Sequence, residues 1–272
     1  MSDGYALRGR MWLPRTPATR CAVLYVHGIQ SHGGWFEWSA SLLARHGAGV
    51  LLPDRRGSGL NPADRGDTPA AERWLADLDE LSDWAAREWG STRCAVVGVS
   101  WGGKPALAWA LRRPERVGRV LLIAPGLFPV VDIGFAARLR IGAALLIHPQ
   151  LEFPIPLDDP ALFTDNPAGR AFIADDPLKL TRATAKFFYE SVRLDRMLRR
   201  VKTGALRAEA TLILAGRDRI VRNEPMVAWL RRCAAAPPTV RTLADAAHTL
   251  EFEPEVGVLG ELLTEWAQSL GD

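Results

Sequence analysis

One short stretch, residues 94–107, restricts the fold of this chain more than any other. The apolar run at 94–97 predicts a buried strand, residues 104–111 predict a helix, and Ser100 falls in the turn between them. Glycines stand two residues before and two residues after the serine, which gives the pattern G-x-S-x-G. A strand that reverses directly into a helix brings these two backbone positions close together, so a Cβ atom at either would clash. The pattern predicts that Ser100 projects from the carboxyl end of a strand, although a chance match with Ser100 as a helix N-cap is the alternative.

Strands and helices alternate on both sides of one long interruption. Apolar runs typical of buried strands occur at residues 21–26, 49–54, 119–124 and 209–215, and further strands are expected at 5–13 and 239–243. Amphipathic helical patterns separate them at residues 35–46, 69–89, 223–233 and 254–270. This alternation predicts an α/β fold, in which a mostly parallel central sheet has helices on both faces.

The interruption covers residues 127–208 and contains most of the phenylalanines of the chain. Because it follows the strand at 119–124, it would extend over the carboxyl edge of the sheet, where open α/β sheets bind ligands. We therefore expect an α/β core formed by residues 1–126 and 209–272. Residues 127–208 are expected to form a helical cap, or lid, over that core.

Composition narrows the class of protein. With 48% hydrophobic and 24% charged residues in a chain of 272, a folded globular protein with a large core is expected. The net charge of +3 comes from arginines spread along the chain without a dense basic tract, which argues against nucleic acid as a partner. No histidines or cysteines have the spacing of metal ligands, so we expect no metal and no cofactor. The three cysteines lack that spacing, which favours free thiols in a reducing compartment: Cys21, Cys94 and Cys233. The absence of a signal-peptide pattern after Met1 favours the cytoplasm.

Ser100 needs two partners to become a nucleophile. A histidine must accept the hydroxyl proton, and a carboxylate must hold the tautomer of that histidine. His248 follows the last predicted strand, and Asp218 follows the strand before it. The chain order Ser100, Asp218, His248 is the order of a catalytic triad on a strand–turn–helix serine. Each assignment has an alternative. Asp245 competes with Asp218 as the acid, and Asp218 alone could cap a helix or pair with a neighbouring arginine. His248 alone could be a surface-loop histidine without a catalytic role.

The negative charge that develops on an attacked carbonyl oxygen needs two hydrogen-bond donors. The backbone amide of Trp101 lies at the start of the predicted helix, and the amide of Ile29 lies in the glycine-rich loop that follows His27 and Gly28. Both are expected to form the oxyanion hole. His27 itself is expected to support the loop by hydrogen bonding, with a role as a second base as the alternative.

Five segments resemble the α/β-hydrolase superfamily, in the right order and over nearly the whole chain: 26–28, 53–59, 98–103, 215–221 and 247–253. Within it the chain looks most like the monoacylglycerol lipase and lysophospholipase group, also called serine aminopeptidase-like, because residues 164–167 and 176–178 are similar to that group's cap pattern. The resemblance implies a helical cap inserted after the sixth strand. It also implies Ser100 as nucleophile, Asp218 as acid, His248 as base and the amides of Ile29 and Trp101 as the oxyanion hole. The chain departs from the group after Gly28, where a Glu-His pair is usual, and at Trp101, where methionine is common.

These observations predict a serine hydrolase that cleaves a carboxylic ester with a medium or long acyl chain, such as a monoacylglycerol or a lysophospholipid, through an acyl-enzyme. The same triad serves thioester, amide or peptide, and carbon–carbon bonds, and a non-catalytic binding protein on this scaffold is the remaining alternative. Apolar residues of the cap are expected to bind the acyl chain, or else to pack the cap onto the sheet: Phe128, Phe135, Leu145, Phe153 and Phe187. A basic cluster in the cap suggests a weak contact with a membrane surface, or else a solvated helix face: Arg193, Arg196, Arg199, Arg200 and Lys202. The sequence leaves the oligomeric state open.

Overall fold

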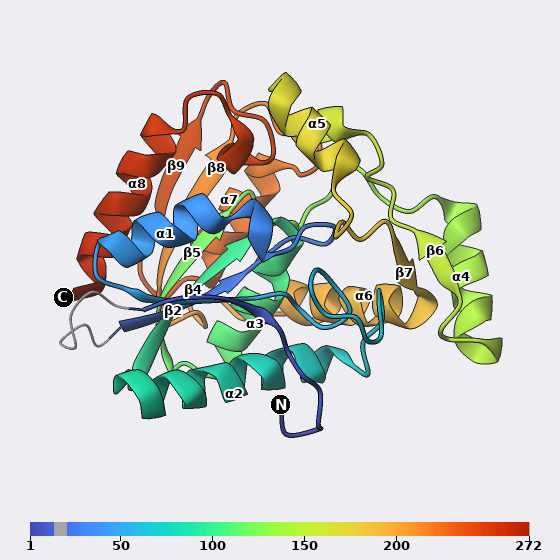
Figure 1. Cartoon of the computed structure of the whole chain (residues 1–272), viewed down its shortest axis with the longest axis horizontal. Coiled ribbons are helices and arrows are strands. Elements are labelled where there is room, and N and C mark those ends of the chain that lie inside the picture. The colour runs from blue at the N-terminus through green and yellow to red at the C-terminus, as the bar shows by residue number, and fades with distance from the viewer. Residues whose placement is uncertain (14–20, 272) are drawn as a thin grey trace.

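The structure is a computed structural model that describes residues 1–13 and 21–271. Within these residues, seven strands form one sheet in the order β1-β3-β2-β4-β5-β8-β9 (Figure 1). Only the edge strand β1 (Gly9–Trp12) runs antiparallel to its neighbour, and the others are parallel: β2 (Cys21–Val26), β3 (Gly49–Pro53), β4 (Arg93–Val99), β5 (Val117–Ile123), β8 (Glu209–Ala215) and β9 (Thr239–Leu243). The predicted α/β fold with a mostly parallel sheet is confirmed.

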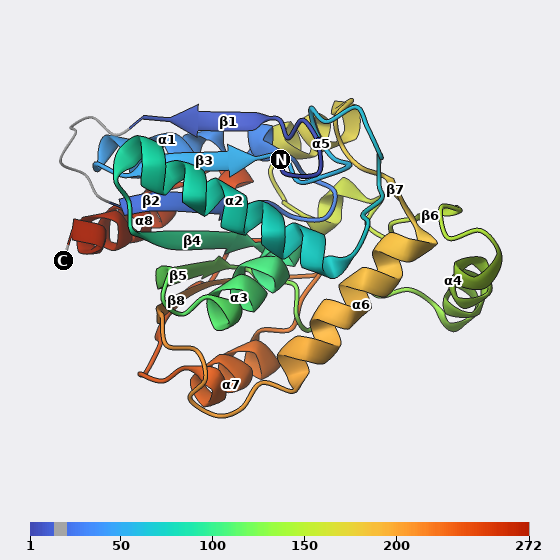
Figure 2. The same ribbon diagram turned by 90° about the horizontal axis from the view of Figure 1, so that it is seen from below.

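Helices cover both faces of the sheet, which explains why the central strands are continuous apolar runs. One face is covered by α1 (Glu37–Arg45) and α8 (Gly257–Gln268), and the other by α2 (Ala71–Trp89), α3 (Gly103–Arg112) and α7 (Asn223–Cys233) (Figures 1 and 2). In β2 and β4 every residue after the first is buried. On α2 the buried stripe runs through Trp74, Leu78 and Ala85, at helical spacing.

The segment at residues 127–208, called the insertion below, leaves the sheet after β5 and returns at β8. It holds three helices and a small antiparallel pair of strands: α4 (Phe135–Ile147), β6 (Glu152–Pro154), α5 (Pro167–Asp175), β7 (Arg182–Thr184) and α6 (Ala185–Arg199). The pair β6 and β7 was not predicted, because strands of three residues are too short for a recognisable alternation.

The expected position of the insertion after a sixth strand is corrected by the structure. Within the described residues β5 is the fifth strand, and no strand precedes β1. Residues 1–8 instead fold against α2, where the Glu80 carboxylate accepts hydrogen bonds from the backbone N–H and the hydroxyl of Ser2, each of 2.7 Å. The predicted strand at 5–13 is accordingly shorter and covers Gly9–Trp12.

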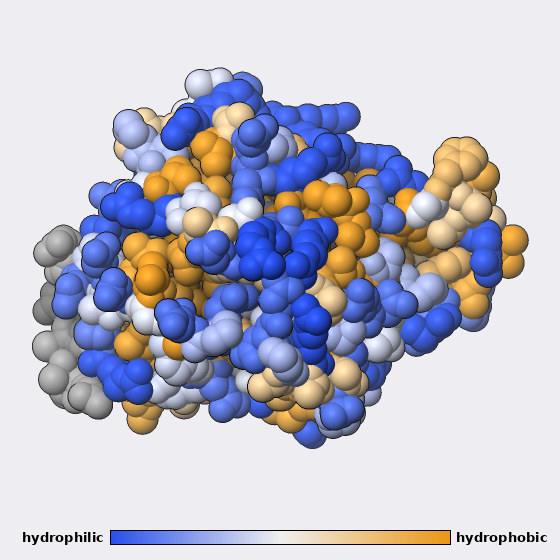
Figure 3. All heavy atoms as spheres, turned by 90° about the horizontal axis from the view of Figure 1, so that it is seen from above, coloured by the Kyte–Doolittle hydropathy of each residue, from blue (hydrophilic) through white to orange (hydrophobic). Residues whose placement is uncertain are grey.

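Two parts of the insertion relate differently to the core. Helix α6 lies along α2 and α3, whereas α4 projects from the body of the molecule (Figures 1 and 2). Four large apolar side chains of α4 are exposed: Phe135, Leu139, Leu146 and Ile147. The projection at the right of Figure 3 has many hydrophobic residues. In the part of the chain that the structure describes, no helix combines the length and the apolar character needed to span a membrane.

Candidate active site

Ser100 lies at the end of β4, at the start of a short helical turn, η2 (Ser100–Gly102), that leads into α3. Its φ angle is +51°, a conformation that residues with a Cβ atom rarely adopt. A Cβ atom on Gly98 would lie 2.7 Å from the Cα of Gly103, and one on Gly102 would lie 2.2 Å from the carbonyl oxygen of Val26. The strained turn therefore needs glycine at both positions, as its sequence indicates.

Ser100, His248 and Asp218 lie together in hydrogen-bonding geometry. The distance from Ser100 Oγ to His248 Nε2 is 2.8 Å, and that from His248 Nδ1 to Asp218 Oδ2 is also 2.8 Å. The side chains of His248 and Asp218 are only 2% and 1% exposed. Asp218 follows β8 and His248 follows β9, so the carboxyl ends of β4, β8 and β9 bring the three residues to one place.

The carboxylate of Asp218 is held in a fixed orientation. Its Oδ1 atom accepts hydrogen bonds from the backbone amides of Ile220 and Val221, at 2.8 and 2.9 Å, which leaves Oδ2 for His248. An Nδ1–H that donates to Asp218 leaves the Nε2 lone pair free to accept the proton of Ser100. The competing acid, Asp245, is exposed, and the Nδ1 atom of His248 bonds to Asp218.

His27 fixes the peptide that carries the amide of Ile29. Its Nδ1–H donates to the carbonyl oxygen of Gly28 at 2.9 Å, and its Nε2 accepts from the backbone N–H of Arg55 at 2.9 Å. Burial, together with the nearby charge of Arg55, lowers the pKa of His27 to about 3, so this ring is neutral. The Gly28 carbonyl and the Ile29 N–H belong to the same trans peptide and point in opposite directions. The N–H of Ile29 therefore points away from His27.

A buried arginine that sequence reasoning missed contacts both predicted oxyanion residues. The Nη2 atom of Arg55 donates a hydrogen bond to the carbonyl oxygen of Ile29. The guanidinium carbon lies 5.1 Å from the ring centroid of Trp101 and 5.0 Å from that of Phe187. Such contacts with ring faces stabilise a desolvated cation, and burial lowers the pKa of Arg55 to about 9. Nothing in the run Asp54-Arg55-Arg56 distinguishes this arginine from its neighbour, which instead pairs with Asp77.

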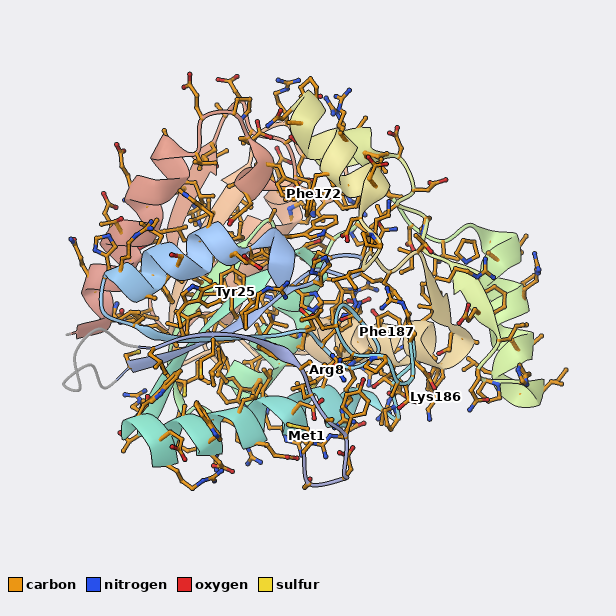
Figure 4. All side chains as sticks on the ribbon, viewed as in Figure 1. Met1, Arg8, Tyr25, Phe172, Lys186 and Phe187 are labelled. Atoms are coloured by element: carbon orange, nitrogen blue, oxygen red, sulfur yellow. The ribbon has the colours of Figure 1, made fainter. Side chains whose placement is uncertain are left out.

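Trp101, the residue after the serine, connects the site to the insertion. Its ring is buried and stacks on Phe187 of α6, with ring centroids 5.5 Å apart. The indole Nε1–H donates to the hydroxyl of Ser191, also on α6, at 2.8 Å. Phe187 is buried at the junction between α6 and the core (Figure 4).

A small pocket opens beside Ser100. Its volume is about 20 Å³, room for about one water molecule. One wall is the loop at residues 28–31. Apolar side chains form most of the other walls: Trp35, Phe36, Val99, Leu157 and Phe163. Ser100, His248 and Thr249 complete the lining. The insertion contributes Leu157 and Phe163, from the segment between β6 and α5.

None of the five cap residues expected to bind an acyl chain is among the residues that line this pocket. Phe135 is 77% exposed on α4, whereas Phe153 and Phe187 are buried in the packing of the insertion. Phe128 and Leu145 are half-buried and pack against buried apolar residues. The apolar pattern of a helix does not tell which of its side chains faces a cavity and which faces solvent. Contact between these five residues and a substrate stays a prediction.

Several hydrogen bonds hold the insertion over the site. The Asp176 carboxylate accepts from His32 Nε2 at 3.1 Å and from Trp35 Nε1 at 2.7 Å. The backbone amide of Leu180 donates to the carbonyl oxygen of Gln30 at 2.9 Å.

In the basic cluster of α6, Arg193 is paired with Glu72 and Glu190. Across residues 1–13 and 21–271, no group of three or more His, Cys, Asp or Glu side chains is placed to hold a metal ion.

Comparison with known proteins places this geometry in a family. Residues 17–255 match the family described as serine aminopeptidase, S33. The chain belongs to this family. It is thereby a member of the α/β-hydrolase superfamily, which its sequence resembles.

Three relatives illustrate the likeness. The crystal structure of a monoacylglycerol lipase from Paleococcus ferrophilus is similar with a TM-score of 0.84 at 23% identity, over 97% of this chain and 99% of that one. A soluble variant of the monoglyceride lipase from Saccharomyces cerevisiae, in complex with a substrate analog, has a TM-score of 0.84 at 16% identity, over 98% and 93%. The human monoglyceride lipase is 24% identical over 260 residues, which cover 94% of this chain and 84% of the relative. Three other curated relatives are longer, and the match with this chain covers only 15%, 41% and 47% of their lengths.

Proposed function

We propose that this protein is a serine esterase that cleaves carboxylic esters through an acyl-enzyme intermediate. The observation that carries the proposal is the continuous hydrogen-bonded relay from Ser100 through His248 to Asp218. In this mechanism Ser100 Oγ attacks the ester carbonyl while His248 Nε2 accepts its proton. The amides of Ile29 and Trp101 stabilise the oxyanion. His248 then donates the proton to the leaving alcohol, and a water molecule releases the acid by the same route in reverse.

The substrate class that we propose is a monoacylglycerol, a lysophospholipid or a similar ester of a medium or long acyl chain. The mostly apolar walls beside Ser100 support an apolar substrate, since each methylene group removed from water contributes about 0.8 kcal/mol. The similarity to monoacylglycerol lipases over nearly the full chain supports the same class. In this proposal residues 127–208 act as a cap on the core, and the cap moves to admit the chain, because the pocket holds only about 20 Å³.

An ester panel with wild type and three variants tests the proposal. The panel contains p-nitrophenyl esters from acetate to laurate, a monoacylglycerol and a lysophospholipid. Ser100→Ala is expected to lower kcat by about 10⁶, as removal of a triad serine does. Asp218→Asn is expected to lower it by about 10⁴, because the histidine then takes the wrong tautomer. Asp245→Asn, an exposed aspartate near His248 in sequence, is the matched control and should keep full activity.

Labelling by a fluorophosphonate separates chemistry from substrate choice. Wild type should be labelled at Ser100, and Ser100→Ala should not. If Ser100 is labelled but no ester is turned over, the ester proposal fails and thioesters, amides and carbon–carbon bonds are tested next. If Ser100 is not labelled at all, the serine mechanism itself is wrong.

A further inference from the structure

One carboxylate of the insertion, that of Asp165, is bound by the two arginines that flank the triad acid, Asp218. Arg219 donates through both of its terminal nitrogens, with Nη1 at 2.9 Å from Oδ1 of Asp165 and Nη2 at 3.0 Å from Oδ2. Arg217 donates through Nη2 to the same Oδ2 atom. The forked contact fixes direction as well as distance, because a planar guanidinium matches the two oxygens of a carboxylate. Asp165 therefore holds the loop at residues 217–219 on both sides of Asp218.

Asp165 is itself fixed and charged. Arg170 of α5 donates to its Oδ1 atom at 2.7 Å. The hydrogen bond from Arg219 is the largest cause that lowers the pKa of the Asp165 carboxyl, so the group is ionised at neutral pH. Isolated ion pairs at a protein surface contribute little, whereas one carboxylate shared by three arginines forms a network. The network joins the insertion to the loop of the triad acid.

The same part of the insertion also fixes the loop of the triad base, His248. The carbonyl oxygen of Phe163 accepts a 2.8 Å hydrogen bond from the backbone N–H of Thr249, which follows His248. The rings of Phe163 and His248 meet in a T-shaped arrangement, with centroids 6.2 Å apart. Residues 163–165 thus hold both partners of the hydrogen bond between His248 and Asp218.

We propose that Asp165 is a positioning residue for the triad, an inference that rests on the proposed esterase function. Asp165 is not among the residues that line the pocket beside Ser100, so it acts through Arg217 and Arg219. These arginines keep Asp218 in the place from which its Oδ2 atom meets His248 Nδ1 at 2.8 Å. Catalysis depends steeply on such placement, since a shift of about 1 Å can lower a rate by about a hundredfold. The insertion in this view completes the active site as well as covering it.

Asp165→Asn, compared with Glu152→Gln, tests this role. The asparagine keeps the size of the side chain but removes the charge and one of the two acceptor oxygens. We expect kcat for the best ester of the panel to fall by about tenfold, a partial misplacement, while KM stays close to the wild-type value. Glu152 pairs with Arg182 within the strand pair β6 and β7, so Glu152→Gln should keep the wild-type kcat. Turnover is expressed per site that the fluorophosphonate labels at completion, so a misfolded fraction does not count.

The Asp218→Asn background separates positioning from a general structural role. If Asp165 acts by holding Asp218 to His248, its substitution should cost nothing further once the Asp218 carboxylate is gone, because two changes in one pathway are not additive. The double variant is therefore expected to have the kcat of Asp218→Asn alone. A structural role in the fold or in the pocket would lower kcat by the same factor in both backgrounds.

A second variant approaches the contact from the core. Arg219→Lys keeps the charge but cannot make the forked contact. It is expected to lower kcat at nearly constant KM, and this loss should likewise disappear in the Asp218→Asn background. Arg219→Lys decides the question where Asp165→Asn does not fold.

The failure of the positioning role differs from the failure of the esterase. Wild-type kcat in both Asp165→Asn and Arg219→Lys, or equal losses with and without Asp218, would overturn the positioning role and leave the esterase standing. If wild type is labelled at Ser100 but turns over no ester, the esterase proposal fails, and the rate constant of labelling takes the place of kcat. Labelling about tenfold slower in Asp165→Asn would then support the positioning role, and an equal rate would overturn it. A wild type that is not labelled would overturn both.

Discussion

At the scale of single residues, Arg55 is expected to position the oxyanion hole. It binds the Ile29 carbonyl and packs on the ring of Trp101, the two residues whose amides are proposed to hold the oxyanion. A lysine ammonium cannot reproduce both a directed hydrogen bond and planar stacking. We expect Arg55→Lys to lower kcat for an ester by about tenfold and Arg55→Met by about a hundredfold, the scale of one lost oxyanion donor. KM should change less, because the oxyanion exists only in the transition state.

Steady-state kinetics on the best ester of the panel, with the exposed Arg87→Met as the matched control, measure this effect. Arg87→Met should resemble wild type in kcat and KM. If both Arg55 variants raise KM and keep the wild-type kcat, Arg55 serves substrate binding or general packing instead, and the positioning role is wrong.

At the scale of elements, the junction of β4 with α3 depends on the glycine after Ser100. A Cβ atom on Gly102 would lie 2.2 Å from the carbonyl oxygen of Val26 and 2.5 Å from that of His27, so β2 would have to shift. We expect Gly102→Ala to reduce the free energy of unfolding by at least about 3 kcal/mol, as severe overpacking does. Gly142, within α4, has no atom within 4 Å of its Cβ position, and Gly142→Ala should stabilise by about 0.5–1 kcal/mol. Urea unfolding of both variants measures the contrast, and equal effects would contradict it.

A carboxyl group in the turn at residues 250–252, that of Glu251, bonds to the start of α1, and its titration couples folding to pH. Glu251 accepts a 2.8 Å hydrogen bond from the backbone amide of Ser39, and burial raises the pKa of its carboxyl to about 7. The folded state then binds this proton more tightly than the unfolded state, whose glutamate has a pKa of about 4.3. The resulting stabilisation is full below about pH 4.3 and is lost as the pH rises toward 7.

Glu251→Gln removes this titration and keeps an acceptor for Ser39. Between pH 5 and pH 8 the variant should gain about 2 kcal/mol of unfolding free energy relative to wild type. Urea unfolding at the two pH values measures the gain, and Glu255→Gln, on an exposed residue nearby, should show none. The same pH dependence in wild type and Glu251→Gln would show that Glu251 does not titrate in this range.

At the scale of the whole molecule, the sequence predicted the α/β fold and the meeting of Ser100, Asp218 and His248, because parallel strands share one carboxyl edge. Once Ser100, Asp218 and His248 were each assigned to the end of a strand, their convergence followed from the sheet. Arg55 had no such signal, since its contacts with Ile29 and Trp101 depend on which loops meet in space. The insertion was expected to be helical, but its packing follows contacts between irregular segments, so its pocket residues, Leu157 and Phe163, were not predicted.

The closed insertion leads to the last prediction, that Asp176 limits access to Ser100. Its carboxylate is the common acceptor for His32 and Trp35, and it joins the insertion to the loop beside the pocket. Asp176→Ala leaves these two donors unpaired, which weakens closure by about 1–3 kcal/mol. A long-chain alkyl fluorophosphonate needs more opening than a short one, because the closed pocket holds only about 20 Å³. We expect the ratio of the two labelling rate constants, long over short, to rise by about tenfold in Asp176→Ala, the equivalent of about 1.4 kcal/mol. Asp175→Ala, at the exposed neighbouring aspartate, should leave the ratio unchanged. An equal change in both rate constants in Asp176→Ala would instead mean that closure through Asp176 does not control entry to the site.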